Sequence, residues 1–130
     1  MMKITRRMSM TELIFVYGTL LTGEGNWSHY LKPAIGTPDK IDAKLKMVSF
    51  GGFPGVVKTS KDFPPIIGEL FEVDDETLLR VDGLEGHPNW YVREQYETVS
   101  GKLSWIYIYP KEQLLSGIST IESSSWLDRD

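Results

Sequence analysis

The chain has 130 residues, of which 41% are hydrophobic, 25% charged and 12% aromatic, a composition typical of a globular domain and unlike that of a disordered or fibrous chain. Fourteen Lys and Arg residues stand against 18 Asp and Glu residues, and the net charge of -4 argues against a protein that binds phosphate backbones, so we expect no nucleic-acid partner. The absence of cysteine excludes disulfides, thiolate nucleophiles and cysteine-ligated zinc.

The first ten residues differ in character from the rest of the chain. Residues 1–10 are basic and lack apolar periodicity, so we expect a loose N-terminal tail before a single domain over residues 11–130. The apolar run that follows, 13–17, is too short for the hydrophobic region of a signal peptide or for a membrane span. We therefore expect a cytoplasmic, monomeric protein with no targeting segment and no membrane partner.

Several stretches have the β-branched and aromatic composition, or the polar-apolar alternation, of strands. In chain order they cover residues 13–17, 34–36, 41–50, 56–57, 66–73, 91–99 and 103–109. The last two flank the turn at 100–102, which predicts a hairpin. Gly68 lies inside a predicted strand and indicates a bulge or a close backbone approach at that point.

One main helix is predicted, over residues 75–83. Asp74, Asp75 and Glu76 supply a cap and an acidic first turn, and Leu78, Val81 and Leu84 recur every three residues before the terminating glycines at 83 and 86. Short helical turns are expected at 27–31 and 111–115. This order of many strands and few helices predicts an α+β fold, with a curled sheet or small barrel covered by helices.

The sequence contains few of the residue patterns that common enzymes use. His29 and His87 lie far apart and lack metal-binding spacing, so we expect no metal site and interpret both as exposed loop residues. Nucleophile-elbow, Walker A and dinucleotide-binding glycine patterns are absent from the sequence. Triad hydrolases and nucleotide-binding proteins are therefore disfavoured.

A glycine follows the first predicted strand, in the segment Tyr17-Gly18-Thr19-Leu20. Where a strand stops at a glycine, successive backbone N–H groups can point into one concavity and hold an anion such as a carboxylate. An ordinary tight turn is the alternative interpretation of the same residues.

Glu85 lies at the C-terminal end of the main predicted helix. A carboxylate there faces the negative end of the helix dipole, and Asp82 lies three residues away on a similar face, so both effects should raise the pKa of Glu85. Such a conflict with helix preferences is typical of functional positions. The alternative is a solvated surface acid.

In these segments the chain resembles the gamma-glutamylcyclotransferase-like proteins, in particular the gamma-glutamylamine cyclotransferase and AIG2-like branch. The matching segments, in the order of the family, are Phe15 to Gly23 with Asn26, Phe53-Pro54-Gly55-Val56, Gly68 to Val73, and Asp82 to Arg93, with a similar tail over Ile121 to Trp126. The resemblance implies a mixed-strand β-barrel with flanking helices. It also implies conversion of a γ-glutamyl amine, for example γ-glutamyl-ε-lysine or a γ-glutamyl amino acid, to 5-oxoproline and a free amine without a cofactor.

The resemblance also implies roles for individual residues. Glu85 matches the catalytic acid/base, and the turn Tyr17, Gly18, Thr19 and Leu20 matches the loop that holds the glutamyl group. Tyr91 could line the pocket and Arg93 could pair with an acid, although a charge on the sheet surface is the favoured interpretation of Arg93. Tyr107 and Tyr109 are interpreted as packing or rim residues.

Two other classes of function stay open from the sequence alone. One is a non-catalytic module on the same fold that binds a small molecule or a protein. The other is a different carboxylate-dependent lyase or hydrolase, because a fold does not fix a function.

Overall fold

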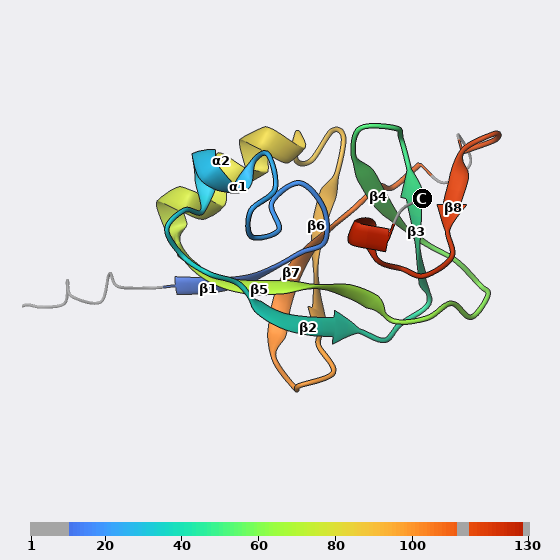
Figure 1. The fold of residues 1–130 in the computed structure, drawn as a ribbon, viewed down its shortest axis with the longest axis horizontal. Coiled ribbons are helices and arrows are strands. Elements are labelled where there is room, and N and C mark those ends of the chain that lie inside the picture. The colour runs from blue at the N-terminus through green and yellow to red at the C-terminus, as the bar shows by residue number, and fades with distance from the viewer. Residues whose placement is uncertain (1–10, 112–114, 129–130) are drawn as a thin grey trace, which may run out of the picture.

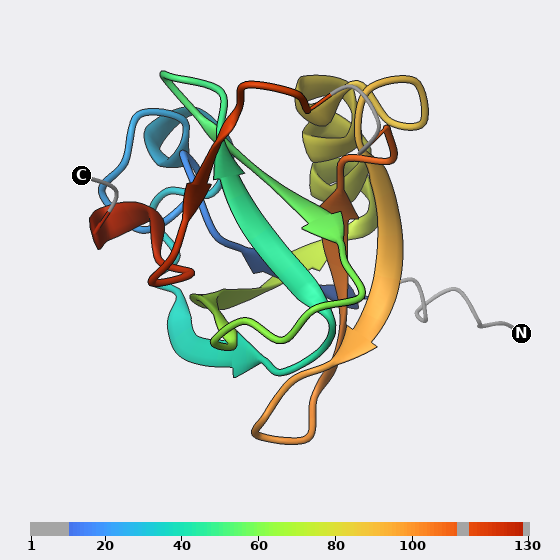
Figure 2. The same ribbon diagram turned by 90° about the vertical axis from the view of Figure 1, so that its right-hand side faces the viewer.

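Strands arranged in two sheets form the framework of the fold (Figures 1 and 2). In the computed structural model, which describes residues 11–111 and 115–128, the five-stranded sheet has the order β2-β5-β1-β7-β6 and the three-stranded sheet the order β4-β3-β8. The strands are β1 (Thr11–Val16), β2 (Thr37–Ile41), β3 (Leu45–Ser49), β4 (Pro54–Lys58), β5 (Ile66–Asp74), β6 (Val92–Glu97), β7 (Leu103–Ile108) and β8 (Ser119–Ile121). The expected α+β class with a curled sheet is confirmed. The predicted loose tail lies outside the described residues.

The larger sheet is mixed, because β1 and β7 run parallel while its other neighbours are antiparallel. The N–H group of Tyr109, just after β7, donates to the carbonyl of Val56 in β4 at 2.8 Å and joins the two sheets. Side chains that are fully withdrawn from water fill the interior, among them Phe15, Met47 and Ile106. Removing these apolar surfaces from water is the main stabilising contribution to the fold.

The strand predicted over 41–50 is wrong as a single element. β2 ends at Ile41 and β3 begins at Leu45, and the two strands belong to different sheets. Both residues at this junction are 1% exposed, so the apolar alternation continues across a bend that turns the chain from one sheet to the other. The strand predicted at 34–36 is also wrong, because β2 begins at Thr37, and β8 had not been predicted.

The main helix, α2 (Asp75–Glu85), begins and ends at defined caps. The side chain of Asp74 accepts a hydrogen bond from the N–H group of Thr77 at 2.8 Å, which confirms the predicted cap. The helix continues past Gly83, where its end had been predicted, and ends at Gly86 in the left-handed conformation with φ 68°. Glu85 is therefore the last helical residue. The short helix α1 (Trp27–Tyr30) lies near α2 (Figure 1).

Gly68 allows β5 to pack closely against β1. A Cβ atom at this position would lie 2.2 Å from the carbonyl oxygen of Val16 and 2.7 Å from the ring of Phe15, so the expected close backbone approach is confirmed. A 3-10 helix, Trp126–Asp128, buries Trp126 against the core. The helical turn predicted at 111–115 lies largely outside the described residues.

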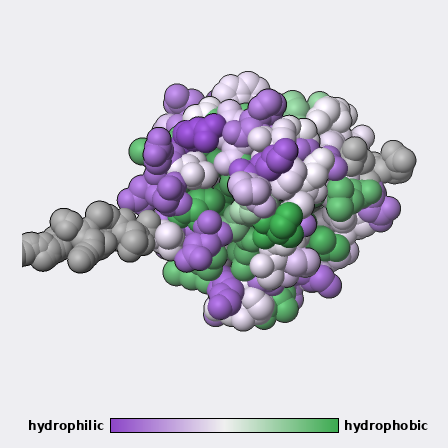
Figure 3. Space-filling view, turned by 60° about the vertical axis from the view of Figure 1, so that its left-hand side comes forward, coloured by the Kyte–Doolittle hydropathy of each residue, from purple (hydrophilic) through white to green (hydrophobic). Residues whose placement is uncertain are grey.

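On the face shown in Figure 3, hydrophobic side chains gather in a patch that is surrounded by hydrophilic ones. Eight large hydrophobic residues are exposed within the described part of the chain: Ile35, Phe53, Ile67, Leu79, Trp90, Val99, Leu103 and Leu127. Within 11–111 and 115–128, no helix has the length and apolar character needed to cross a membrane.

Candidate functional site

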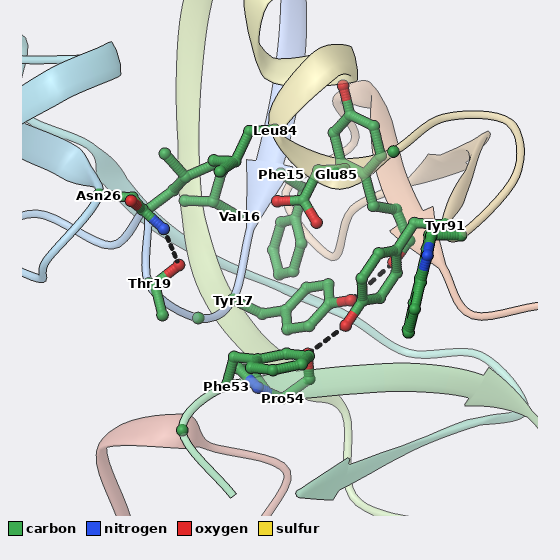
Figure 4. A pocket seen from close by; sticks show the side chains of 16 residues that line it. Phe15, Val16, Tyr17, Thr19, Asn26, Phe53, Pro54, Leu84, Glu85 and Tyr91 are labelled. Carbon is green, nitrogen blue, oxygen red and sulfur yellow. Dashed lines mark hydrogen bonds between the residues drawn. The ribbon is translucent and has the colours of Figure 1, made fainter. Parts of the chain in front are cut away.

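A pocket of about 480 Å³ lies where the chain segment after β1, the end of α2 and the start of β4 meet (Figure 4). It is lined by every residue that the sequence singled out for the site: Tyr17, Gly18, Thr19, Leu20 and Glu85. The other lining residues are Phe15, Val16, Asn26, Gly52, Phe53, Pro54, Leu84, Gly86, Trp90, Tyr91 and Tyr107. The fold thus brings the predicted turn and the predicted carboxylate, distant in sequence, into one cavity.

Hydrogen bonds within the loop hold the turn after β1. The N–H group of Leu21 donates to the carbonyl of Gly18 at 3.0 Å, and Asn26 donates to Thr19 twice, from its backbone at 2.9 Å and from Nδ2 to Oγ1 at 2.8 Å (Figure 4). Within the described residues, the N–H groups of Gly18, Thr19 and Leu20 donate to no other group. Three successive free donors at a pocket wall can hold a carboxylate.

Gly18 lets this turn lie directly against the start of β4. A Cβ atom on Gly18 would come within 2.6 Å of Cγ of Pro54, a distance that side chains do not tolerate. The glycine is therefore required by the contact between the turn and the neighbouring sheet, in addition to any requirement from a ligand.

The carboxylate of Glu85 projects from the last turn of α2 into the pocket, beside the ring of Phe15 (Figure 4). Burial raises its pKa from the ordinary value of 4.5 to about 7. The predicted direction of the shift is confirmed, but the cause is withdrawal from water and not the charge of Asp82. A solvated surface acid, the alternative from the sequence, does not describe this carboxylate.

Three tyrosines that line the pocket donate their hydroxyl protons to other groups of the protein. Tyr17 donates to the carbonyl of Tyr107 at 2.7 Å, Tyr91 donates to the carbonyl of Pro54 at 2.7 Å, and Tyr107 donates to Oδ1 of Asp82 at 2.6 Å. Burial is the main cause that raises the pKa of each hydroxyl, and nearby acidic or tyrosine side chains raise it further. All three tyrosines therefore stay neutral. A hydroxyl has one proton, so these groups offer a ligand only acceptor lone pairs.

Arg93 and Asp82 form a half-buried ion pair behind the pocket. Nε of Arg93 donates to Oδ1 of Asp82 at 2.8 Å, and the guanidinium lies 4.3 Å from the ring centroid of Trp105. The favoured sequence interpretation, a charge on the sheet surface, is wrong, and pairing with an acid is confirmed. Tyr107 was interpreted as a packing or rim residue, but it lines the pocket and joins this pair.

Among the residues that the structure describes, neither histidine belongs to a cluster of metal ligands. His29 is exposed on α1, whereas His87 is half-buried and its Nδ1 accepts the N–H group of Arg93 at 3.3 Å. In the part of the chain that the structure describes, no three or more His, Cys, Asp and Glu side chains come together as a possible metal site.

A first prediction concerns the cost of burying Glu85. Its folded pKa of about 7 lies above the ordinary 4.5, so the charged form disfavours the folded state, and stability is lost as the pH rises from 4.5 through 7. Glu85→Gln carries no such charge and should exceed the wild type in unfolding free energy by up to about 3 kcal/mol at pH 9. At pH 4 the two should differ little. Urea denaturation at both pH values measures this, and a gain that is equal at both would contradict it.

Comparison with known proteins agrees with the fold and the pocket. A family model described as "Gamma-glutamyl cyclotransferase, AIG2-like" matches residues 14–128. A putative gamma-glutamylcyclotransferase of Methanocaldococcus jannaschii is 39% identical over 106 residues, which are 77% of this chain and 86% of the relative. The solution NMR structure of protein ytfP from Escherichia coli superposes with a TM-score of 0.68 at 32% identity, covering 91% of this chain and 98% of that chain.

A further relative is named for a specific reaction. The Gamma-L-glutamyl-butirosin B gamma-glutamyl cyclotransferase of Niallia circulans is 33% identical over 112 residues, which are 78% of this chain and 69% of the relative. The fold and the matches define a protein of the gamma-glutamylcyclotransferase type. The chain belongs to the gamma-glutamyl cyclotransferase, AIG2-like family, and the resemblance seen in its sequence is confirmed. It is a gamma-glutamylcyclotransferase-like enzyme.

Proposed function

We propose that the enzyme converts a γ-glutamyl amine to 5-oxoproline and the free amine, with Glu85 as general base and acid. The α-amine nitrogen attacks the γ-carbonyl carbon, a new C–N bond closes the ring, and the bond from that carbon to the leaving nitrogen breaks. The observation that carries the proposal is the carboxylate of Glu85, with a pKa of about 7, in the same pocket as the free N–H groups of the turn.

In this proposal, the two charged groups of the glutamyl moiety bind to different parts of the pocket. The free N–H groups of the turn supply donors for the α-carboxylate. Glu85 and the acceptor oxygens of Tyr17 and Tyr91 suit the α-ammonium. Glu85 then removes a proton from the ammonium, which frees the nucleophile, and returns a proton to the leaving nitrogen.

Holding the glutamyl chain in a curled conformation supplies a further part of the acceleration. Intramolecular reactions between well-positioned groups reach effective molarities of about 10⁵ to 10⁸ M. Leu20, Val16 and Phe15 give the pocket apolar walls that can restrict the methylene chain. The reaction needs no water and no cofactor.

A panel of γ-glutamyl compounds tests the proposal, with 5-oxoproline detected by mass spectrometry. The panel contains γ-glutamyl-ε-lysine, γ-glutamyl amino acids and glutathione. Release of 5-oxoproline by the wild type and its loss in Glu85→Gln would support the proposal. Tight binding of these compounds without turnover would instead favour the non-catalytic binding module.

The pH dependence of the reaction should follow Glu85. A general base must be deprotonated, so kcat/KM should fall about tenfold for each pH unit below about 7. The measurement is kcat/KM for 5-oxoproline release from about pH 5 to about pH 8. An acid limb centred near the ordinary carboxylate value of 4.5 would show that the burial of Glu85 does not control the rate.

A further inference from the structure

A carboxylate of β5 ties the loop between β1 and α1, residues 18–26, to the larger sheet. Oε1 of Glu69 accepts two hydrogen bonds from Thr22, one from its backbone N–H group at 2.9 Å and one from its hydroxyl at 2.8 Å. Oγ1 of Thr22 in turn accepts the N–H group of Gly36, just before β2, at 3.0 Å. Thr22 is thereby joined both to β5 and to the segment that leads into β2.

The fold leaves room for the side chain of Glu69 at Gly36. A Cβ atom on Gly36 would lie 2.5 Å from Oε1 and 2.7 Å from Cβ of Glu69, so a larger residue there would displace the carboxylate. In the antiparallel pair of β1 and β5, Glu69 lies opposite Val16, the last residue of β1. The carboxylate therefore starts from the place where the loop leaves the sheet.

The composition of the loop makes such an anchor necessary. Gly23 and Gly25 are exposed, and a Cβ atom on either would meet nothing within 4 Å. Glycine loses more conformational freedom on folding than any other residue, so the local sequence does little to fix this loop. The hydrogen bonds from Leu21 to Gly18 and from Asn26 to Thr19 close the loop on itself. The bonds to Glu69 connect it to a neighbouring strand.

Glu69 acts on the pocket through this loop. It does not line the cavity, whereas the three residues of the turn with free N–H groups do. Resting on the proposed cyclisation, we propose that Glu69 is a positioning residue, which holds the loop so that these N–H groups meet the α-carboxylate of the substrate. The α-carboxylate keeps its charge during ring closure, so its binding contributes equally to the ground state and the transition state. Loss of the anchor should therefore raise KM and change kcat little.

Glu69→Ala tests this role on the γ-glutamyl compound that the wild type converts fastest. We expect KM to rise about 10-fold and kcat to stay within about threefold, because two hydrogen bonds to a charged acceptor are lost. Glu69→Gln keeps an acceptor oxygen for both donors of Thr22 and should restore most of the wild-type KM. Thr22→Val keeps the backbone bond alone and should raise KM by a smaller factor.

Glu72→Ala is the matched control. Glu72 also lies on β5 and accepts a threonine hydroxyl, that of Thr11 at 2.8 Å, but Thr11 is the first residue of β1 and lies at the opposite end of that strand from the loop. This variant should retain the wild-type KM. Amide hydrogen exchange supplies a measurement that is independent of turnover: residues 21–26 should exchange faster in Glu69→Ala than in Glu72→Ala.

Each contrary result has a separate meaning. A wild-type KM in folded Glu69→Ala, a loss confined to kcat, or an equal rise of KM in Glu69→Ala and Glu69→Gln would overturn the positioning role and leave the cyclisation intact. If Glu69→Ala does not fold, an unchanged KM in Thr22→Val would overturn it in the same way. Absence of 5-oxoproline from the wild type with the whole panel would overturn the cyclisation, and the role of Glu69 with it.

Discussion

Replacing Glu85 by glutamine is expected to lower kcat for 5-oxoproline release by about 10²- to 10⁴-fold, the usual contribution of a general acid or base. Glutamine has nearly the same size, so the pocket keeps its shape, but an amide cannot take a proton from the α-ammonium of the substrate. The measurement is the initial rate at saturating substrate, with the product quantified by mass spectrometry. KM should change much less than kcat, because the free N–H groups of the turn are untouched.

A second carboxylate on the same helix provides the matched control. Glu76 is exposed in the first turn of α2, at the opposite end from Glu85, so Glu76→Gln should retain the wild-type rate. Both variants lose one potential negative charge, and a comparison between them isolates the position of the carboxylate from the change in net charge. Wild-type kcat in Glu85→Gln would rule out the proposed role.

The strands were largely predictable because each carries a local pattern, while their assignment to sheets was not. The alternation from Ile41 to Met47 continues through the bend between β2 and β3, because both sheets face one core. The alternation shows only which side chains are buried, so it does not change where the chain passes from one sheet to the other. The end of α2 was predicted too early for a related reason: Gly83 disfavours helix locally, yet the left-handed cap at Gly86 decides where the helix ends.

The turn after β1 and Glu85, the two parts of the candidate site, could be found in the sequence because each has a local signal. Gly18 follows a buried strand, and Glu85 sits at the unfavourable end of a helix. Tyr107 carried no comparable signal, since its role depends on contacts between β7, α2 and the turn after β1. The cause of the raised pKa of Glu85 was likewise inaccessible, because burial is a property of the assembled pocket.

Contacts behind the pocket connect the turn after β1 with the end of α2 that carries Glu85, and Asp82 lies at their centre. This carboxylate is 8% exposed and accepts from both Arg93 and Tyr107, while the carbonyl of Tyr107 accepts the hydroxyl of Tyr17 beside the turn. The network thus fixes the last turn of α2 relative to β7 and to the turn after β1.

Asp82→Asn is therefore expected to destabilise the protein by about 3 kcal/mol, the lower end of the range for removing one partner of a buried ion pair. Asparagine keeps the volume but leaves the guanidinium of Arg93, whose side chain is 18% exposed, without its counter-charge. Urea denaturation at neutral pH measures the loss. Asp62→Asn removes the acid of an exposed pair with Lys44 and should leave the stability nearly unchanged.

The double variant Asp82→Asn/Arg93→Met separates the ion pair from other effects of the substitution. With both charges gone, no unpaired guanidinium remains, and the double variant should be less destabilised than the sum of the two single variants. Strict additivity, or an unfolding free energy of Asp82→Asn equal to that of the wild type, would show that the pair does not hold α2 against β6 and β7. Coupling between the two positions would establish that the end of the helix carrying Glu85 is anchored by charge as well as by its apolar face.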